Sequence, residues 1–199
     1  PSRFVQMLAA AWRMLAAEGR AEGARFLEVG AGAGMKLMLA REFFDTVHGL
    51  EFDEGYVERA ELVLAGEPPQ CRVMQGDATV FDDYGAYDVI YSYLPMMDED
   101  GQREIETRIS DQMRPGAVLI APFCRHAQLW EDISHFAPDM YMKGVTPERA
   151  KEIAKAARRV GRDIPRPSSR PRRPHLKAPV PGLFAPVTEA LARAGYRWV

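Results

Sequence analysis

The feature that most constrains the fold is a glycine cluster, Gly30-Ala31-Gly32-Ala33-Gly34, which directly follows a short apolar run at residues 24–29. A helical pattern over residues 35–44 comes next. Glycine lets a backbone turn sharply and approach a ligand closely, and a helix N-terminus offers unpaired N–H groups. This order of strand, glycine turn and helix predicts a nucleotide-like ligand at the carboxyl end of a sheet.

Strand-like and helical patterns alternate from residue 24 to residue 122. The strand-like runs lie at residues 24–29, 47–51, 71–75, 87–92 and 116–122. The helical patterns lie at residues 3–18 and 35–44, from Asp53-Glu54 onward, and at 101–113. Alternation of this kind predicts an α/β fold, a three-layer sandwich around a mostly parallel, doubly wound sheet with right-handed crossovers.

Composition sets the class of protein. The 199 residues, 47% of them hydrophobic, fit one domain with some decoration, and a net charge of -2 selects no partner. Cys71 and Cys124 form neither a disulfide framework nor a zinc pattern. No apolar run approaches the roughly 20 residues of a membrane span, and the charged, amphipathic N-terminal run is not a secretory signal. We therefore expect a cytoplasmic protein that does not enter a membrane.

The spacing of the glycines argues against a dinucleotide ligand. The dinucleotide fingerprint has glycine at relative positions one, three and six, whereas position six here is Met35 and the third glycine, Gly34, comes one residue early. Glu28 stands just before the turn, where an acid repels a pyrophosphate but can receive a cationic amino group. The motif thus favours a cationic nucleoside over a pyrophosphate.

With these features the sequence resembles the class I (Rossmann-like) S-adenosylmethionine-dependent methyltransferases. The first motif of that family is an acid, any residue and then alternate glycines, as in Glu28 to Gly34. Glu51, 23 residues later, lies where the family binds both ribose hydroxyls. Asp77, in Gly76-Asp77-Ala78, lies where an acid contacts the adenine amino group, and Phe52 where an apolar side chain lies against adenine. Residues 87–95 and 113–116 match two further motifs.

The resemblance covers about residues 3–122 and implies a cofactor, a site and a reaction. The cofactor is S-adenosylmethionine, and the residues implied to bind it are Glu28, Gly30, Gly32, Gly34, Glu51, Phe52, Asp77, Ala78 and Ser92. The reaction is methyl transfer to a nitrogen or oxygen nucleophile of a small molecule or a protein side chain. Because the sulfonium is already activated, the reaction needs mainly orientation and exclusion of water, and no metal.

The acceptor side is expected just after the fourth strand-like run. Tyr93 and Pro95 lie past its end and are the candidates to shape an acceptor pocket. Tyr93, Asp98 and His126 are the candidates for a general base. For two acids and one histidine a structural role stays open. Asp77 could cap a turn, Asp98 could start a helix, and His126 could be a buried or exposed structural group.

A narrower similarity links two short segments to a group of small methyltransferases that includes protein-lysine methyltransferases. These segments are Pro1-Ser2 with Val5 to Leu8, and Tyr91 to Pro95. That group often has an acid where this chain has Ala33, so its substrate is not carried over.

The C-terminal third departs from the family pattern. We divide the chain into a core at residues 1–122, an insert or lid at 123–182, and a final helix and strand of the core at 183–199. Within the insert, residues 147–160 have a helical pattern that starts at a Thr-Pro-Glu cap. A seventh strand is hard to find, so the sheet is either shortened or completed by a partner along its edge; an oligomer is left open.

Residues 158–177 are strongly basic, with eight Arg and Lys residues against Asp163 alone, and six prolines lie between 165 and 181. This segment is either a solvated loop or lid, or a clamp for an anion such as nucleic acid, a phosphorylated substrate or an acidic protein surface. Two other functions are left open for the whole chain: a catalytically silent S-adenosylmethionine-binding partner subunit, and a nicotinamide-dependent oxidoreductase.

Overall fold

The computed structural model describes residues 2–126 and 130–161, and in these residues a seven-stranded sheet organises the chain. Its order is β3-β2-β1-β4-β5-β7-β6. The strands are β1 (Arg25–Val29), β2 (Thr46–Glu51), β3 (Cys71–Gln75), β4 (Val89–Ser92), β5 (Val118–Ile120), β6 (Ile133–Ala137) and β7 (Met140–Lys143). The first five are parallel, which confirms the predicted α/β fold with a mostly parallel, doubly wound sheet.

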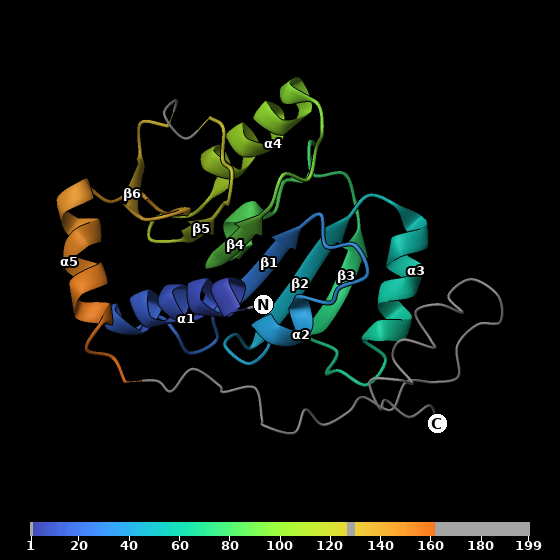
Figure 1. The fold of residues 1–199 in the computed structure, drawn as a ribbon, viewed down its shortest axis with the longest axis horizontal. Helices are drawn as coiled ribbons and strands as arrows, with labels where there is room; N and C mark the ends of the chain where they lie inside the picture. The colour runs from blue at the N-terminus through green and yellow to red at the C-terminus, as the bar shows by residue number, and fades with distance from the viewer. Residues whose placement is uncertain (1, 127–129, 162–199) are drawn as a thin grey trace. The chain divides into compact units, whose positions relative to one another are not determined.

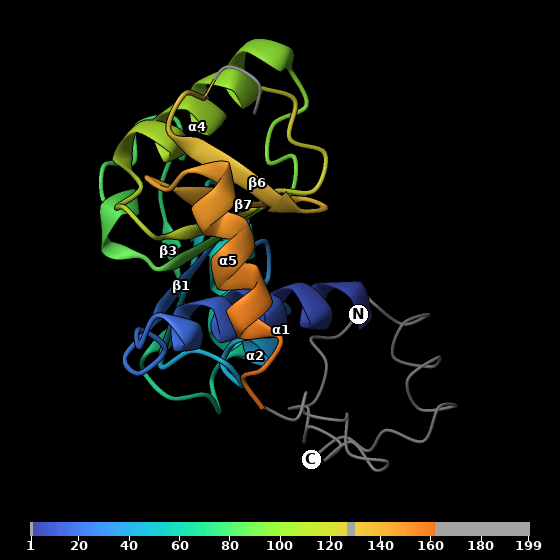
Figure 2. The ribbon, with the colours of Figure 1, turned by 90° about the vertical axis from the view of Figure 1, so that its left-hand side faces the viewer.

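Helices cover both faces of this sheet (Figures 1 and 2). They are α1 (Ser2–Ala17), α2 (Leu37–Ala40), α3 (Glu54–Val63), α4 (Glu99–Gln112) and α5 (Pro147–Ala157), with a 3-10 turn, η1, at Tyr84–Ala86. One apolar cluster joins α1, α2 and α5 to one face, through residues such as Leu8, Phe26 and Ile153. A second joins α4 and η1 to the other face, through residues such as Leu27 and Ile105. The three layers follow because successive side chains of a strand point to opposite faces of the sheet, so that Phe26 and Leu27 of β1 lie in different clusters.

Three helices begin at side-chain caps. Asp53 accepts from the Tyr56 N–H at the start of α3, Asp98 from the Gly101 N–H at the start of α4, and Thr146 from the Arg149 N–H at the start of α5. The last two caps bear on the sequence predictions. Asp98 moves the start of α4 two residues ahead of the predicted residue 101, and the Thr-Pro-Glu start of α5 is confirmed.

The helix predicted at residues 35–44 is wrong in length. Only α2, four residues long, is helical, and turns flank it on both sides. Gly34 has a φ of +74°, so the chain leaves the loop in a left-handed conformation and enters the helix late. The run of apolar residues still packs, since Leu37, Phe43 and Phe44 are buried in the first cluster.

The structure contains two strands that the sequence did not predict, both inside the segment interpreted as an insert or lid. β7 lies antiparallel to β5, and β6 lies antiparallel to β7, joined to it by a turn in which Asp139 has a φ of +63°. The seventh strand that was hard to find is therefore present, and it adds directly to the parallel strands. The predicted helix at 183–194 and strand at 195–199 lie outside the described residues.

Candidate functional site

The glycine loop between β1 and α2 has a backbone that only glycine adopts readily. Gly30, Gly32 and Gly34 have φ values of +72°, +53° and +74°. The N–H groups of Gly30 and Ala31 donate to the Leu50 carbonyl, at 2.9 and 3.1 Å, which ties the loop to the end of β2. The loop therefore lies at the carboxyl end of the sheet, where α/β folds bind ligands.

The three glycines differ in what surrounds them. A Cβ atom at Gly30 would lie 3.1 Å from the Pro95 side chain, and one at Gly34 would lie 3.1 Å from Leu64. A Cβ atom at Gly32 would meet no atom within 4 Å. Gly30 and Gly34 thus serve packing within the fold, whereas Gly32 borders open space.

Glu51, at the end of β2, lies beside that open space. Its carboxylate accepts the Gly32 N–H at 2.7 Å and the Asp53 N–H at 3.0 Å, one on each oxygen. A carboxylate has about four lone-pair sites, so these two bonds fix its orientation and leave it able to accept two hydroxyls. This arrangement fits the predicted ribose-binding role.

Glu28, on β1, is a buried carboxylate with 1% of its surface exposed. The Lys36 ammonium lies 2.5 Å from its Oε1 atom. Its Oε2 atom is also buried and has no hydrogen-bond partner among the described residues. Burial raises the pKa of Glu28 to about 7, although the Lys36 charge lowers it, and the nearby Glu51 raises it further.

Lys36 was not singled out in the sequence. Besides Glu28 it lies over the ring of Tyr91 on β4, with its Nζ atom 5.3 Å from the ring centroid. Tyr91 is buried edge-on against Phe4 of α1, with the two centroids 4.9 Å apart. A lysine two residues after a glycine loop that an acid precedes is the signal that sequence reasoning could have used.

The residues predicted to contact adenine follow β2 and β3. Phe52 is 73% exposed, so its apolar ring is free to pack against a ligand. Asp77 accepts from the Thr79 N–H at 2.8 Å and from its hydroxyl at 2.7 Å, so it also caps a turn. These two hydrogen bonds lower the pKa of Asp77. Ala78 is partly buried against the second apolar cluster.

The predicted acceptor side follows β4. Ser92, at the end of β4, is buried, whereas Tyr93 is 50% exposed. The Tyr93 ring meets the ring of Phe123 edge-on at 5.5 Å, and Phe123, which follows β5, is itself 61% exposed. Leu94 and Phe123 both have positive φ values, of 44° and 65°. The turns after β4 and β5 thus present an exposed aromatic pair beside the glycine loop, because Pro95 packs on Gly30.

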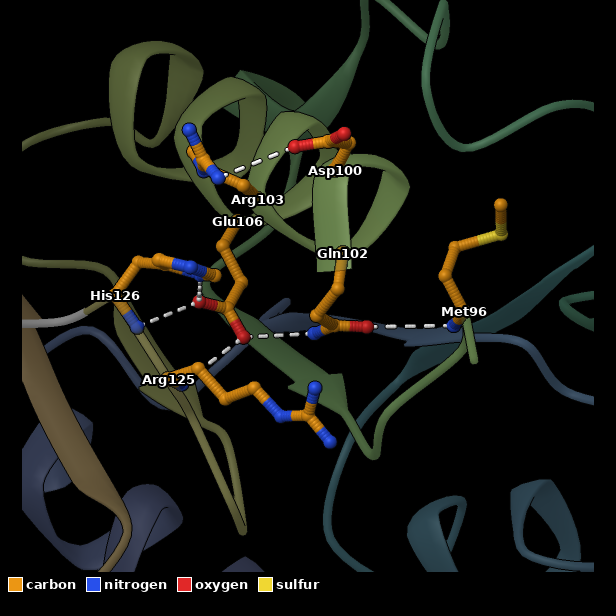
Figure 3. Close-up of polar contacts among 7 residues, drawn as sticks. All are labelled: Met96, Asp100, Gln102, Arg103, Glu106, Arg125 and His126. Carbon is orange, nitrogen blue, oxygen red and sulfur yellow. Dashed lines mark hydrogen bonds and ion pairs between the residues drawn. The ribbon is translucent and has the colours of Figure 1, made fainter. Parts of the chain in front are cut away.

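A buried carboxylate on α4 holds these two turns in place (Figure 3). Glu106 accepts the backbone N–H of His126 at 2.9 Å and of Arg125 at 3.3 Å, and its Oε2 atom lies 2.8 Å from His126 Nδ1. It also accepts from the Gln102 side chain at 2.7 Å, and the Gln102 oxygen in turn accepts the Met96 N–H at 3.3 Å. Sequence reasoning did not predict this network.

The three candidates for a general base have different positions. The Asp98 carboxylate caps α4. His126 is buried, and because a carboxylate only accepts, its contact with Glu106 places a proton on Nδ1. Tyr93 is the candidate with an exposed ring at the strand end.

Among residues 2–126 and 130–161, no group of three or more His, Cys, Asp or Glu side chains is arranged to hold a metal ion. In the same part of the chain, no helix has the length and apolar character that crossing a membrane requires.

A cavity of about 470 Å³ along α4, lined by residues such as Arg103 and Asp111, includes no residue of the glycine loop.

The fold and the glycine loop define a Rossmann-like α/β domain whose candidate ligand site lies at the carboxyl ends of β1, β2 and β4. Residues 26–116, somewhat less than half of the chain, match the family model described as a methyltransferase domain. This match confirms the resemblance to methyltransferases noted in the sequence. No curated protein matches the chain.

Solved structures that resemble the chain include three methyltransferases. The amino pentose methyltransferase CalS10 of Micromonospora echinaspora, bound to S-adenosylmethionine, is 27% identical over 59% of this chain and 50% of its own, with a TM-score of 0.48. The glycopeptide N-methyltransferase MtfA with the same ligand is 19% identical, over 57% and 53%, with a TM-score of 0.45. The sugar N-methyltransferase KedS8 of a Streptoalloteichus species is 23% identical, over 56% and 46%, with a TM-score of 0.43. The chain spans about half the length of each.

Proposed function

We propose that this protein binds S-adenosylmethionine at the carboxyl ends of β1 to β4 and transfers its methyl group to a nitrogen or oxygen nucleophile. The observation that carries the proposal is the position of the Glu51 carboxylate. It is oriented by backbone N–H groups on both sides and lies next to the open space at Gly32. A pair of vicinal ribose hydroxyls matches its remaining acceptor capacity.

The other ends of the ligand also find suitable partners. The unpartnered Oε2 atom of Glu28 suits the ammonium of the amino-acid end. Phe52 offers an exposed apolar face to adenine, and Asp77 an acceptor for its amino group. The buried Glu28 before the loop and the half-buried Glu51 beside it favour a ligand with positive charge and disfavour a pyrophosphate, which supports the adenosyl ligand over a nicotinamide dinucleotide.

S-adenosylmethionine supplies a methyl group already activated on its sulfonium, and the acceptor atom gives up a proton when the new bond forms. The protein's part is orientation and exclusion of water. Tyr93 and Phe123 supply apolar contact area for an acceptor beside Pro95 and the glycine loop. A small molecule or a protein side chain remains the acceptor we favour.

Calorimetric titration with S-adenosylmethionine and S-adenosylhomocysteine tests the cofactor assignment. Glu51→Gln should weaken S-adenosylhomocysteine binding by about 10-fold to 100-fold, because hydrogen bonds to a charged acceptor contribute about 1.5–3 kcal/mol. Glu58→Gln, an equal change at an exposed position of α3, should leave it unchanged. Folded wild-type protein that binds neither ligand would refute the cofactor assignment, and equal affinities of the two variants would refute the role of Glu51.

A further inference from the structure

Lys36 is a charged residue of the site that the proposed function does not yet use. It follows the glycine loop, and its ammonium is held between the Glu28 carboxylate, at 2.5 Å, and the Tyr91 ring, at 5.3 Å. Its side chain is nevertheless 42% exposed. Lys36 is therefore fixed at its tip, while part of its side chain borders the solvent.

Glu28 and Lys36 alone do not balance the charge of the ligand ammonium proposed to bind here. Glu28 contributes one negative charge, and Lys36 already neutralises it from the Oε1 side. An ammonium that binds the buried Oε2 atom adds a second positive charge beside the same carboxylate. Two cations around one buried anion repel each other and leave a net positive charge, and a second anion close to both offsets that repulsion.

We infer that Lys36 binds the carboxylate of the amino-acid end of the cofactor, so that Glu28 and Lys36 together recognise an α-amino acid zwitterion. This inference rests on the proposed function. The four charges then alternate in sign: the Lys36 ammonium, the Glu28 carboxylate, the ligand ammonium and the ligand carboxylate. Because a lysine ammonium has three donors, Lys36 can keep its contact with Glu28 while it donates to the ligand.

Tyr91 gives this arrangement its rigidity. The ring lies under the ammonium, is 4% exposed and is held edge-on by Phe4. A cation above an aromatic face is attracted to it without using a hydrogen-bond donor. The ammonium is therefore positioned before the ligand arrives, and its donors remain available.

In the alternative role, Lys36 only neutralises Glu28 and competes with the ligand ammonium for the Glu28 carboxylate. The two roles predict opposite effects of removing the charge. Under the inferred role, Lys36→Met weakens the binding of any ligand that carries the carboxylate. Under the competing role, the same variant tightens it, because the ligand ammonium gains sole access to Glu28.

The experiment compares three probes by calorimetry. S-adenosylhomocysteine carries the whole zwitterion, its carboxyl methyl ester keeps only the ammonium, and 5′-methylthioadenosine lacks the amino-acid end. We expect Lys36→Met to weaken S-adenosylhomocysteine binding about tenfold or more and to leave 5′-methylthioadenosine binding unchanged within about twofold. Lys36→Arg should retain most of the affinity. Lys151→Met, at an exposed position of α5, is the matched control and should bind all three probes as the wild type does.

The methyl ester adds a comparison on the wild type, and that comparison does not depend on whether a variant folds. The wild type should bind the ester about tenfold more weakly than the free acid, whereas Lys36→Met should not distinguish the two, so that the losses are non-additive. Unchanged or tighter S-adenosylhomocysteine binding by Lys36→Met, or an ester that the wild type binds as well as the acid, overturns the inference alone. Wild type that binds none of the probes overturns the proposed function, and the inference with it.

Discussion

Replacing Gly32 with alanine separates the conformational need for glycine from its role beside a ligand. Gly32 has a φ of +53° and open space where a Cβ would lie. Gly19, at the end of α1, has a φ of +70° and equally open surroundings. The two positions are therefore matched in strain and in space, and they differ in that only Gly32 donates to Glu51.

The structure sets the size of the effect on stability. A Cβ in the left-handed region costs about 1–2 kcal/mol, and replacing glycine recovers about 0.4–1 kcal/mol by reducing the entropy of the unfolded chain. Each variant should thus lose about 1 kcal/mol of unfolding free energy, or about 2–4 °C in Tm for a domain of this size. Thermal unfolding of Gly32→Ala and Gly19→Ala should give nearly the same shift.

The effect on binding should differ between the two variants. The new methyl group in Gly32→Ala occupies the space beside the Glu51 carboxylate, and a ligand displaced by it loses at least one hydrogen bond to that charged group. Such a bond contributes about 1.5–3 kcal/mol, so the Kd of S-adenosylhomocysteine should rise about tenfold or more. Gly19→Ala should keep the wild-type Kd. Equal Kd values for the two variants, at equal stability, would show that the space at Gly32 is not where the ligand lies.

Two further predictions concern buried carboxylates. The pKa of Glu28 is about 7 in the folded protein, against an ordinary value of 4.5 that we take for the unfolded chain. The stability that the protonated Glu28 contributes is therefore fully present below pH 4.5 and is lost as the pH rises through 7. The expected loss is about 3 kcal/mol of unfolding free energy, measured by denaturant unfolding at several pH values. The other titratable groups that face Glu28 are Lys36, Glu51 and Tyr91. If the unfolding free energy of Glu28→Gln falls with pH as steeply as that of the wild type, the loss does not come from Glu28. Glu106→Gln should lower the unfolding free energy by about 3 kcal/mol, because one oxygen that accepts N–H groups becomes a donor. Glu104→Gln, exposed on the same helix, should change it by less than about 0.5 kcal/mol, and similar losses for both would mean that the network does not stabilise the fold.

Local signals were enough to predict the parallel part of the fold. The strand predicted at residues 71–75 coincides with β3, since a run bounded by Pro-Pro-Gln and Gly-Asp leaves little choice of limits. Periodicity also placed α1 and α4 within two residues of their starts. These elements have one dominant pattern each, and a pattern of that kind does not depend on the rest of the chain.

β6 and β7 were missed for a physical reason. β7 is buried because it pairs with β5, and β6 pairs only with β7, so neither strand is marked by a local pattern of its own; β7 also ends in a buried lysine, Lys143. That ammonium donates to the Ser110 carbonyl and to Asp132, so a charged residue occupies a position where an apolar one is expected. The Pro138-Asp139 turn was the available hairpin signal, and Asp139 does adopt the left-handed conformation there.

The residues of the candidate site could be predicted from the sequence, whereas the contacts between them could not. The acid, the glycines and Glu51 follow from the order of motifs along the chain. The contact between Lys36 and Glu28 depends on how far the loop turns back over β1, which the sequence does not state. The same holds for Glu106, three of whose four hydrogen bonds reach residues 19 or 20 positions further along the chain, the fourth being to Gln102 on the same helix.

The Glu106 network has a consequence for how acceptor preference can change. The turn after β4 reaches Glu106 through Met96 and Gln102, and the turn after β5 reaches it through His126. Substitutions in one turn alter the support of the other, so their effects on an acceptor should not add. Grafting a turn from a related enzyme should succeed only when both turns and this stretch of α4 are transferred as one unit.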